Sequence, residues 1–483
     1  MKISKRTLKT FMEKLSAPEI RFYAFMIFFA IVFFTGGGAR DDIQSLLMLR
    51  PLAVLFCAYA LAVKIPGQWR ERLFPIYIAC SLLALMVFQL IPLPPSIWTG
   101  LPGRQIFSDI ANIAGIEQPW RPLSLSPSRT LNSLFSLAVP IAAMMLYLNL
   151  DNEYRKRAIP VIIILCAVSG LWAVFQMVGP SRGPLYLYRI TNFGSGVGLF
   201  ANRNHQAVVL SCAIVMLGWY AASQKPNAKL AVLKLYASIA TMLVFIPLIF
   251  VTGSRAGLLL MVPSLLFALF FIYFGRYNSR NARRQNRPRN RKQRFVSPRQ
   301  VILFVSGSAI IGFAALSVIF SRSLAYDRLF NSGGINELRI QVLPTLITMI
   351  RDYMPWGSGF GSFEHVYKIY EPLKLLNPSY FNQAHNDWLQ YPIEGGAAAV
   401  LIAVLGGCWF LIRLTQLAKN WRFSRHEKYA AIMCISIMLF LLAASIGDYP
   451  LRVPSVIALF AVLACIFNDS VRAVQLSEMR QLQ

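Results

Sequence analysis

The sequence predicts an all-α protein that crosses a membrane many times. Hydrophobic residues make up 56% of its 483 residues and charged residues only 14%, whereas a soluble domain carries about 25% charged residues. Apolar stretches of about 20 residues, enough to cross a bilayer core of about 30 Å, recur along the chain. Lys and Arg gather in alternate loops between these stretches, as they do when basic loops stay in the cytoplasm. These three observations together predict a polytopic membrane protein.

The apolar stretches should be helices, because only backbone that is hydrogen-bonded within its own segment can cross lipid. We expect about 12 of them. They lie at residues 21–36, 45–63, 74–92, 132–149, 158–178, 206–222, 232–252, 256–275, 301–320, 396–412, 429–446 and 451–467.

The basic loops give the expected orientation of the chain. Residues 276–300 hold ten Lys or Arg and no acid, within a net charge of +28. We interpret this segment as a cytoplasmic loop that also attracts anionic membrane lipids. It lacks interleaved aromatic residues or a folded module, so we expect no nucleic-acid partner. Both termini fall on the same, cytoplasmic side.

Three consecutive segments follow from this topology. Residues 1–320 would hold nine transmembrane helices, 321–395 a large loop outside the cytoplasm with short helices, and 396–483 three helices and a cytoplasmic tail. A smaller outer loop is expected at 92–130. The seven cysteines all fall in predicted helices, so no disulfide framework is expected. No Cys/His spacing suggests a metal site, and we expect no cofactor.

Polar motifs occur where predicted helices meet the outer side. In chain order they read GLFANRNH at 198–205, TGSRAG at 252–257, PWGSGFGSF at 355–363 and HNDWLQ at 385–390, the last followed by EGG at 394–396. An arginine, Arg339, precedes the third motif. The order and topology of these motifs resemble the O-antigen ligase superfamily, which includes polymerases of lipid-linked polysaccharides.

The resemblance implies a metal-independent, inverting glycosyltransferase of the GT-C class in the bacterial inner membrane. Its expected partners are an undecaprenyl-diphosphate-linked glycan donor and an acceptor, either a lipid A core sugar or another lipid-linked glycan. The first acceptor defines a ligase and the second a polymerase, and the sequence leaves both open. A transporter or flippase is a less favoured alternative, because ionisable residues cluster at one rim rather than at the bilayer midplane.

The resemblance also implies three catalytic residues, Arg255, Arg339 and His385. A guanidinium has donors in a fork that matches phosphate oxygens, so arginines suit a diphosphate leaving group. A histidine suits removal of a proton from the attacking sugar hydroxyl near neutral pH. The position four residues after Arg339, where the family commonly has Trp, is Leu343 here.

Four further residues are candidates for substrate binding. His205 could contact substrate or bond backbone within its helix, and Asn204 could instead cap that helix. Arg351 could pair with the neighbouring Asp352. Glu394 lies nine positions after His385, a spacing that does not by itself favour a His–Glu dyad.

Two arginines near the outer ends of helices carry open alternatives. Arg452 could form a local ion pair with Asp448 or take part in substrate binding. Arg50, a few residues inside a predicted helix, could extend to the headgroup region or point at a lipid diphosphate.

Overall fold

The computed structural model describes residues 13–40, 42–65, 67–70, 72–223, 229–275, 333–376, 381–419 and 425–482. Within these ranges the chain is almost entirely helical, and nine helices are long and apolar enough to cross a membrane. Two more apolar helices are shorter, α3 (Leu46–Ala62) and α4 (Phe74–Gln89). The span expected at 301–320 lies outside the described residues. The predicted all-α membrane class is confirmed.

The described residues fall into two units that interleave along the chain. The first unit draws on Met1–Asp151, Gly333–Gln416 and Leu442–Cys465. Besides α3 and α4 it includes α2 (Pro18–Thr35), α7 (Pro127–Ser136), α8 (Ala138–Leu148), most of α18 (Asp387–Lys419) and the beginning of α20 (Pro454–Leu482). Three segments distant in sequence thus build one body, whereas the segments expected from the sequence are consecutive.

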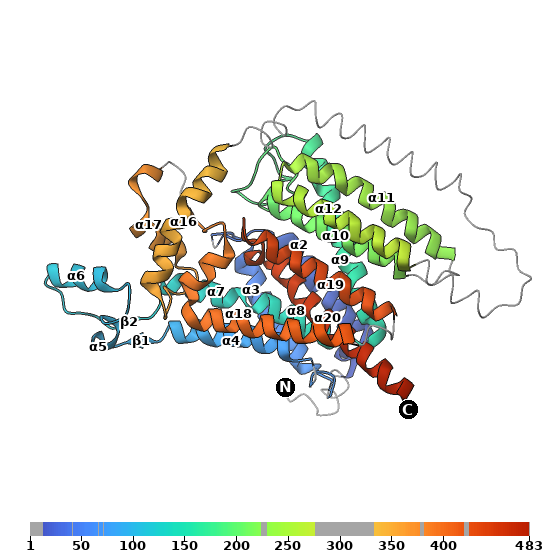
Figure 1. Ribbon diagram of the computed structural model, residues 1–483, viewed down its shortest axis with the longest axis horizontal. Helices are drawn as coiled ribbons and strands as arrows, with labels where there is room; N and C mark the ends of the chain where they lie inside the picture. Colours follow the sequence, from blue (N-terminus) through green and yellow to red (C-terminus); the bar gives the residue numbers. More distant parts are fainter. Residues whose placement is uncertain are drawn as a thin grey trace, which may run out of the picture. The chain divides into compact units, whose positions relative to one another are not determined.

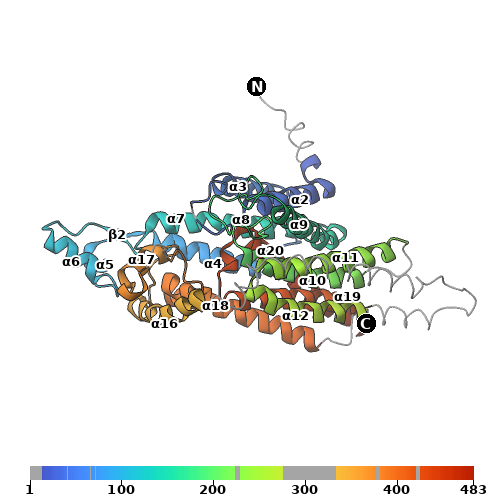
Figure 2. The same cartoon turned by 90° about the horizontal axis from the view of Figure 1, so that it is seen from above.

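The described parts of the two loops that the sequence predicts to lie outside belong to the first unit and lie at the same end of it (Figure 1, Figure 2). The smaller loop holds an antiparallel pair, β1 (Pro92–Leu93) and β2 (Arg121–Pro122), with helices α5 (Pro95–Trp98) and α6 (Gln105–Ile113) between them. The larger loop holds α16 (Gly333–Tyr353), α17 (Phe363–Tyr370) and the 3-10 turn η2 (Leu373–Leu375). At 21 residues, α16 is longer than the short helices that the sequence suggested.

The second unit draws on Asn152–Ser332, Leu417–Leu441 and Ile466–Gln483. It contains α9 (Asn152–Val178), α10 (Arg203–Ser223), α11 (Lys229–Thr252), α12 (Arg255–Phe270) with the π-helical turn η1 (Phe271–Gly275), and most of α19 (Arg425–Ala444). Helix α10 is buried along almost its whole length. A Cβ on Gly218 of α10 would lie 2.4 Å from the Cα of Ala268, so small residues bring these helices close together, as is common in membranes.

Several helix boundaries differ from those expected. Helix α9 begins at Asn152 rather than near 158, and its Arg155 pairs with Asp469 at 3.0 Å. Because this ion pair compensates the charge of Arg155, the apolar helix can begin before the first long apolar run. Helix α18 begins at Asp387 rather than near 396 and continues through Pro392, with its only non-helical residue at Gly396 (φ 62°, ψ −158°).

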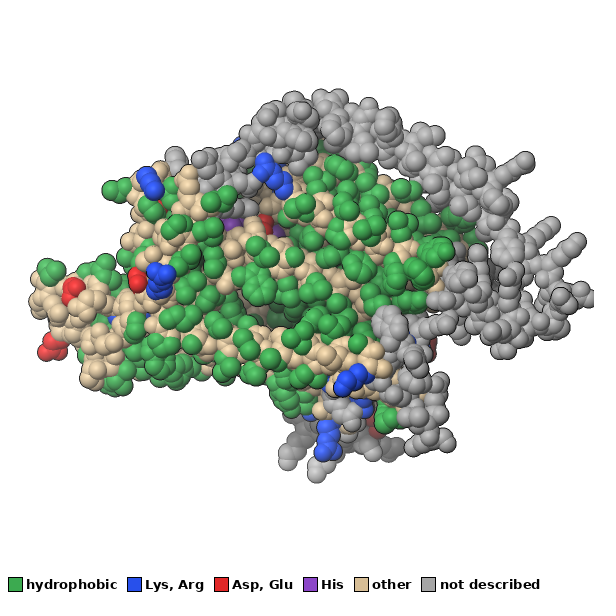
Figure 3. Space-filling model, in the orientation of Figure 1, with side chains coloured by type: hydrophobic (Ala, Val, Ile, Leu, Met, Phe, Trp, Pro, Cys, Tyr) green, Lys and Arg blue, Asp and Glu red, His purple; other side chains and the backbone are tan. Residues whose placement is uncertain are grey.

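Hydrophobic side chains cover most of the visible face of the helices, and charged side chains are sparse there (Figure 3). Large apolar side chains are well exposed along the candidate membrane-spanning helices, for example Leu259 at 75% and Leu401 at 58%. In water such a surface would be costly, but lipid tails solvate it.

Candidate active site

The turn that carries His385 precedes α18 and has an unusual backbone. His385 has φ 51° and, among the residues that the structure describes, is the one non-glycine residue in the left-handed region. An L-residue there costs about 1–2 kcal/mol, and such strain is found at functional sites when surrounding contacts hold it. The backbone conformation therefore fixes the direction of this imidazole, and it lowers the stability of the fold by about that amount.

Asp448 faces the imidazole. Its Oδ1 atom lies 3.5 Å from Nδ1 of His385, and its side chain is only 5% exposed. The backbone N–H of Tyr449 also donates to Oδ1 at 3.0 Å. The imidazole packs between the rings of Tyr449 and Phe381, with ring centroids 5.0 Å and 6.2 Å away. A carboxylate beside Nδ1 favours the tautomer protonated there, which leaves the lone pair on Nε2.

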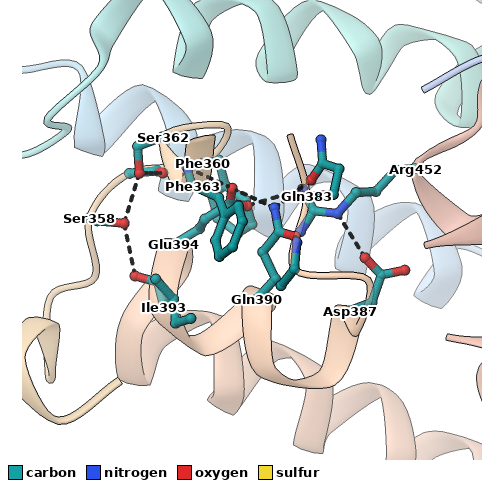
Figure 4. A network of polar contacts seen from close by, with 12 residues as sticks. Ser358, Phe360, Ser362, Phe363, Gln383, Asp387, Gln390, Ile393, Glu394 and Arg452 are labelled. Carbon is teal, nitrogen blue, oxygen red and sulfur yellow. Dashed lines mark hydrogen bonds and ion pairs between the residues drawn. The ribbon is translucent and has the colours of Figure 1, made fainter. Parts of the chain in front are cut away.

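Arg452 links two acids of α18 rather than the local Asp448 that the sequence suggested. Its Nε donates to Oδ1 of Asp387 at 2.7 Å, and its Nη1 donates to Oε2 of Glu394 at 3.1 Å (Figure 4). Burial by itself would lower the pKa of Arg452, but Glu394 and Asp387 raise it above its usual value. The local pair fails because Arg452 lies in the turn η3 (Pro450–Arg452), directed at α18, while Asp448 faces His385.

Glu394 is the centre of this polar network. Its side chain is fully buried, and its Oε1 accepts hydrogen bonds from Gln390 Nε2 at 3.0 Å and the Phe363 N–H at 3.4 Å. Gln390 Oε1 in turn accepts from the N–H of Ala384, directly before His385, at 2.8 Å. The described contacts therefore give Glu394 a structural task, and they place no His–Glu dyad here.

The Gly-rich turn after α16 packs onto the kink of α18. The N–H of Ser358 donates to Ile393 O at 2.8 Å, and that of Gly359 to Glu394 O at 2.9 Å. Gly357 and Gly359 have φ values of 79° and 100°, and a Cβ on Gly357 would lie 2.5 Å from Glu394 O. The third and fourth motifs are thus one structural element, and glycine is needed because backbone meets backbone.

Two residues that sequence reasoning missed attach the smaller outer loop to this element. Gln89, at the end of α4, donates through Nε2 to Glu394 O at 3.0 Å and accepts from the Phe360 N–H at 3.0 Å. Arg104 is 2% exposed and donates to the carbonyls of Gly357, Leu123 and Pro102 at 2.8, 2.5 and 2.9 Å. A glutamine inside an apolar helix is the one signal that could have indicated Gln89.

The remaining predicted residues of the first unit lie on α16. Arg339 is within the helix, but its side chain lies outside the described part of the structure. Arg351 is exposed in the last turn. Among the described residues none forms an ion pair with Arg351, so the expected pair with Asp352 is absent. A substrate role for both arginines stays a prediction.

Three predicted residues belong to the second unit. Arg255 is exposed and opens α12, which Ser254 caps by accepting the Gly257 N–H at 3.1 Å. His205 is 2% exposed within α10. Asn204 donates its N–H to Asn202 Oδ1 at 2.9 Å, so Asn202 caps α10. The roles of Arg255, His205 and Asn204 in substrate contact stay predictions.

The fold and the site define a multi-pass membrane protein with a preorganised histidine–carboxylate pair beside a Gly-rich turn. Residues 240–404 match the family model described as O-antigen ligase. This segment is therefore similar to the O-antigen ligase family, as the motifs in the sequence predicted. It includes the motifs around Arg255, Arg339, Arg351, His385 and Glu394, and it ends before Asp448 and Arg452. No curated protein matches the chain.

Proposed function

We propose that the protein is a glycosyltransferase that moves a glycan from undecaprenyl diphosphate onto an acceptor sugar at the periplasmic face of the inner membrane. The observation that carries the proposal is the contact between His385 Nδ1 and Asp448 Oδ1 at 3.5 Å. His385 lies in the segment that matches the O-antigen ligase model. For the acceptor we propose a lipid A core sugar, as in a ligase; a polymerase that extends another lipid-linked glycan is the alternative.

The proposed reaction is a single displacement. The acceptor hydroxyl oxygen attacks the anomeric carbon, the new glycosidic C–O bond forms, and the bond from that carbon to the diphosphate oxygen breaks. Its electron pair leaves with the diphosphate, and the hydroxyl proton moves to Nε2 of His385. Because the nucleophile enters opposite the leaving group, the anomeric configuration inverts.

The charged residues divide this work. Asp448 holds the imidazole and stabilises the imidazolium that forms, the task of a carboxylate beside a general base. For the diphosphate we propose Arg255 and Arg339, because a guanidinium keeps its charge and binds phosphate oxygens in pairs. Such charge stabilisation needs no metal. Among the residues that the structure describes, no three His, Cys, Asp or Glu side chains group as metal ligands would.

Deletion of the gene, with gel analysis of surface polysaccharide, tests the proposal. Loss of all long glycan on lipid A, with lipid-linked polymer accumulating, is expected for a ligase. Caps of a single repeat unit would identify a polymerase instead, and unchanged polysaccharide would refute glycan transfer by this protein. Complementation with wild type and with His385→Asn separates catalysis from the mere presence of the protein. Purified protein should also remain active in a chelator, and loss that a divalent cation restores would refute metal independence.

A further inference from the structure

A charged side chain lies inside an apolar helix of the first unit, away from the proposed catalytic turn. Arg50 is the fifth residue of α3, which begins at Leu46, so it lies about 6 Å along the helix axis from that end. Ionisable residues in membrane helices are rare and mark functional sites by default, usually together with a partner. A group that compensates the positive charge of Arg50 is therefore expected nearby.

The described contacts of Arg50 leave its charge uncompensated. Nη1 donates to Oδ1 of Asn132 on α7. Its Nε is buried and has no hydrogen-bond partner. No carboxylate of the described residues lies within ion-pair distance of it. A guanidinium has five N–H donors, and a neutral amide satisfies only one of them while supplying no negative charge.

Four other arginines of the described residues have carboxylate or carbonyl partners within the chain. Arg21 pairs with Asp151 at 3.0 Å, with side-chain exposures of 6% and 36%. Arg155 pairs with Asp469 at 3.0 Å. Arg452 binds two carboxylates, as described above, and Arg104 donates to three carbonyl oxygens. Unlike these four, Arg50 has a neutral amide as its partner among the described residues, so the anionic group of a bound molecule would supply the negative charge that these contacts lack.

The surroundings of Arg50 indicate what kind of molecule that is. Leu47 and Val54, about one turn away on either side, are 75% and 50% exposed. On α7, the neighbours of Asn132 are Leu131 and Phe135, which are 44% and 47% exposed. Exposed apolar side chains therefore lie on both helices close to the contact between Arg50 and Asn132. An amphiphile with an anionic head and hydrocarbon chains matches this pattern.

We propose that Arg50, positioned by Asn132, binds the phosphate group of a lipid at the point where these two side chains of α3 and α7 meet. A phosphate offers several oxygens that accept paired hydrogen bonds from a guanidinium. The attraction between the two charges is strongest where water is excluded. Two lipids carry this chemistry at the required depth, the polyprenyl diphosphate donor and a phospholipid headgroup. The assignment of the site to the donor lipid rests on the proposed function. The proposal that Arg50 binds a lipid phosphate does not depend on that function.

Native mass spectrometry of the purified full-length protein tests the site. The probes are undecaprenyl diphosphate and phosphatidylglycerol, added separately and then together. Wild type should retain one more lipid molecule than Arg50→Gln. The apparent affinity of Arg50→Gln for the lipid should be about tenfold or more lower, because charge-assisted paired hydrogen bonds are lost. Arg40→Gln is the matched control, because Arg40 lies in the turn before α3 and is paired with Asp42 at 2.9 Å. It should bind as wild type does.

The arms of the experiment separate the two lipids. Undecaprenyl diphosphate that stays bound in excess phosphatidylglycerol identifies a donor site, and complete displacement identifies a phospholipid site. Equal binding of both lipids to wild type and Arg50→Gln would overturn the proposal. If Arg50→Gln fails to fold, Arg50→Lys and Asn132→Ala replace it: each should bind several-fold more weakly, and wild-type binding by both would overturn the site. Because lipid binding is measured without glycan transfer, a protein that binds lipid through Arg50 but transfers no glycan would refute only the proposed function.

Discussion

Nδ1 of His385 and Oδ1 of Asp448 are 3.5 Å apart, although one residue precedes α18 and the other follows α19. The distance is at the long end for a hydrogen bond, as is common for catalytic pairs before substrate binds. The pair sits among aromatic rings and beside the network of Arg452, which fixes the start of α18. If His385 is the base, as we propose, this arrangement holds it ready to accept a proton without first reorganising.

His385→Asn should abolish glycan transfer while leaving the protein folded. Asparagine tolerates the left-handed conformation that His385 adopts (φ 51°), so this variant removes the base with little added strain. We expect turnover to fall about 10²–10⁴-fold, the usual contribution of acid–base assistance, with donor binding retained. Turnover and donor affinity should be measured separately, with membrane abundance as the control. If donor binding disappears instead, the imidazole is a ligand of the lipid diphosphate and not the base.

Asp448→Asn should slow transfer only through His385. The amide still accepts the N–H of Tyr449 but supplies no charge to the imidazolium. We expect a fall in turnover of about 10–10³-fold with donor affinity unchanged. A double-mutant cycle provides the decisive readout: on a His385→Asn background, Asp448→Asn should cost nothing further. Full additivity of the two effects would show that Asp448 does not act on the histidine.

Gly357→Ala should destabilise the protein far more than a glycine substitution elsewhere at the same φ. Its Cβ would lie 2.5 Å from Glu394 O and 2.6 Å from Gly396 N, so backbone would have to move. Gly67 is the matched control, since its φ of 82° is similar and nothing lies within 4 Å of its Cβ. Gly67→Ala should cost about 1–2 kcal/mol through strain alone. Membrane abundance and thermal unfolding in detergent measure the difference, and equal losses would contradict the close packing of the two motifs.

Arg452→Met should be strongly destabilising because it leaves the carboxylates of Asp387 and Glu394 without their cation. Removing one partner of a buried ion pair costs about 3–5 kcal/mol. Arg40→Gln breaks the exposed pair with Asp42 and should cost at most about 1 kcal/mol. Thermal unfolding of the two variants provides the comparison. A melting temperature like that of wild type for Arg452→Met would mean that the network does not hold the turn.

Arg255→Lys should bind the donor about tenfold or more weakly, because a point charge keeps the attraction but loses the paired hydrogen bonds. Arg255→Ala should weaken donor binding and should also lower the turnover rate about 10²–10³-fold. Arg182→Lys serves as the control in the same unit, since Arg182 lies over the ring of Phe193 at 5.4 Å and should tolerate the exchange. Donor affinity and turnover are the measurements, and wild-type values for Arg255→Lys would remove Arg255 from the diphosphate site.

Much of the fold could be predicted because lipid imposes a strict rule on the sequence. Backbone in a bilayer must form helices, so apolar length alone located the membrane helices of the described ranges, including α2, α10 and α20. Boundaries were less predictable wherever a polar group is compensated from a distance. Arg155 extends α9 because Asp469 pairs with it, and no local pattern contains that information.

The motifs by themselves predicted that the turn of His385 and the Gly-rich turn form the functional site, since their residue types and order resemble one family. Only the tertiary structure decided the partners. Asp448 rather than Glu394 faces His385, Arg452 binds Asp387 and Glu394 rather than Asp448, and Gln89 and Arg104 secure the Gly-rich turn. The reason is that helical spacing specifies neighbours within a helix, whereas these contacts join segments from opposite ends of the chain whose meeting depends on how the helices pack.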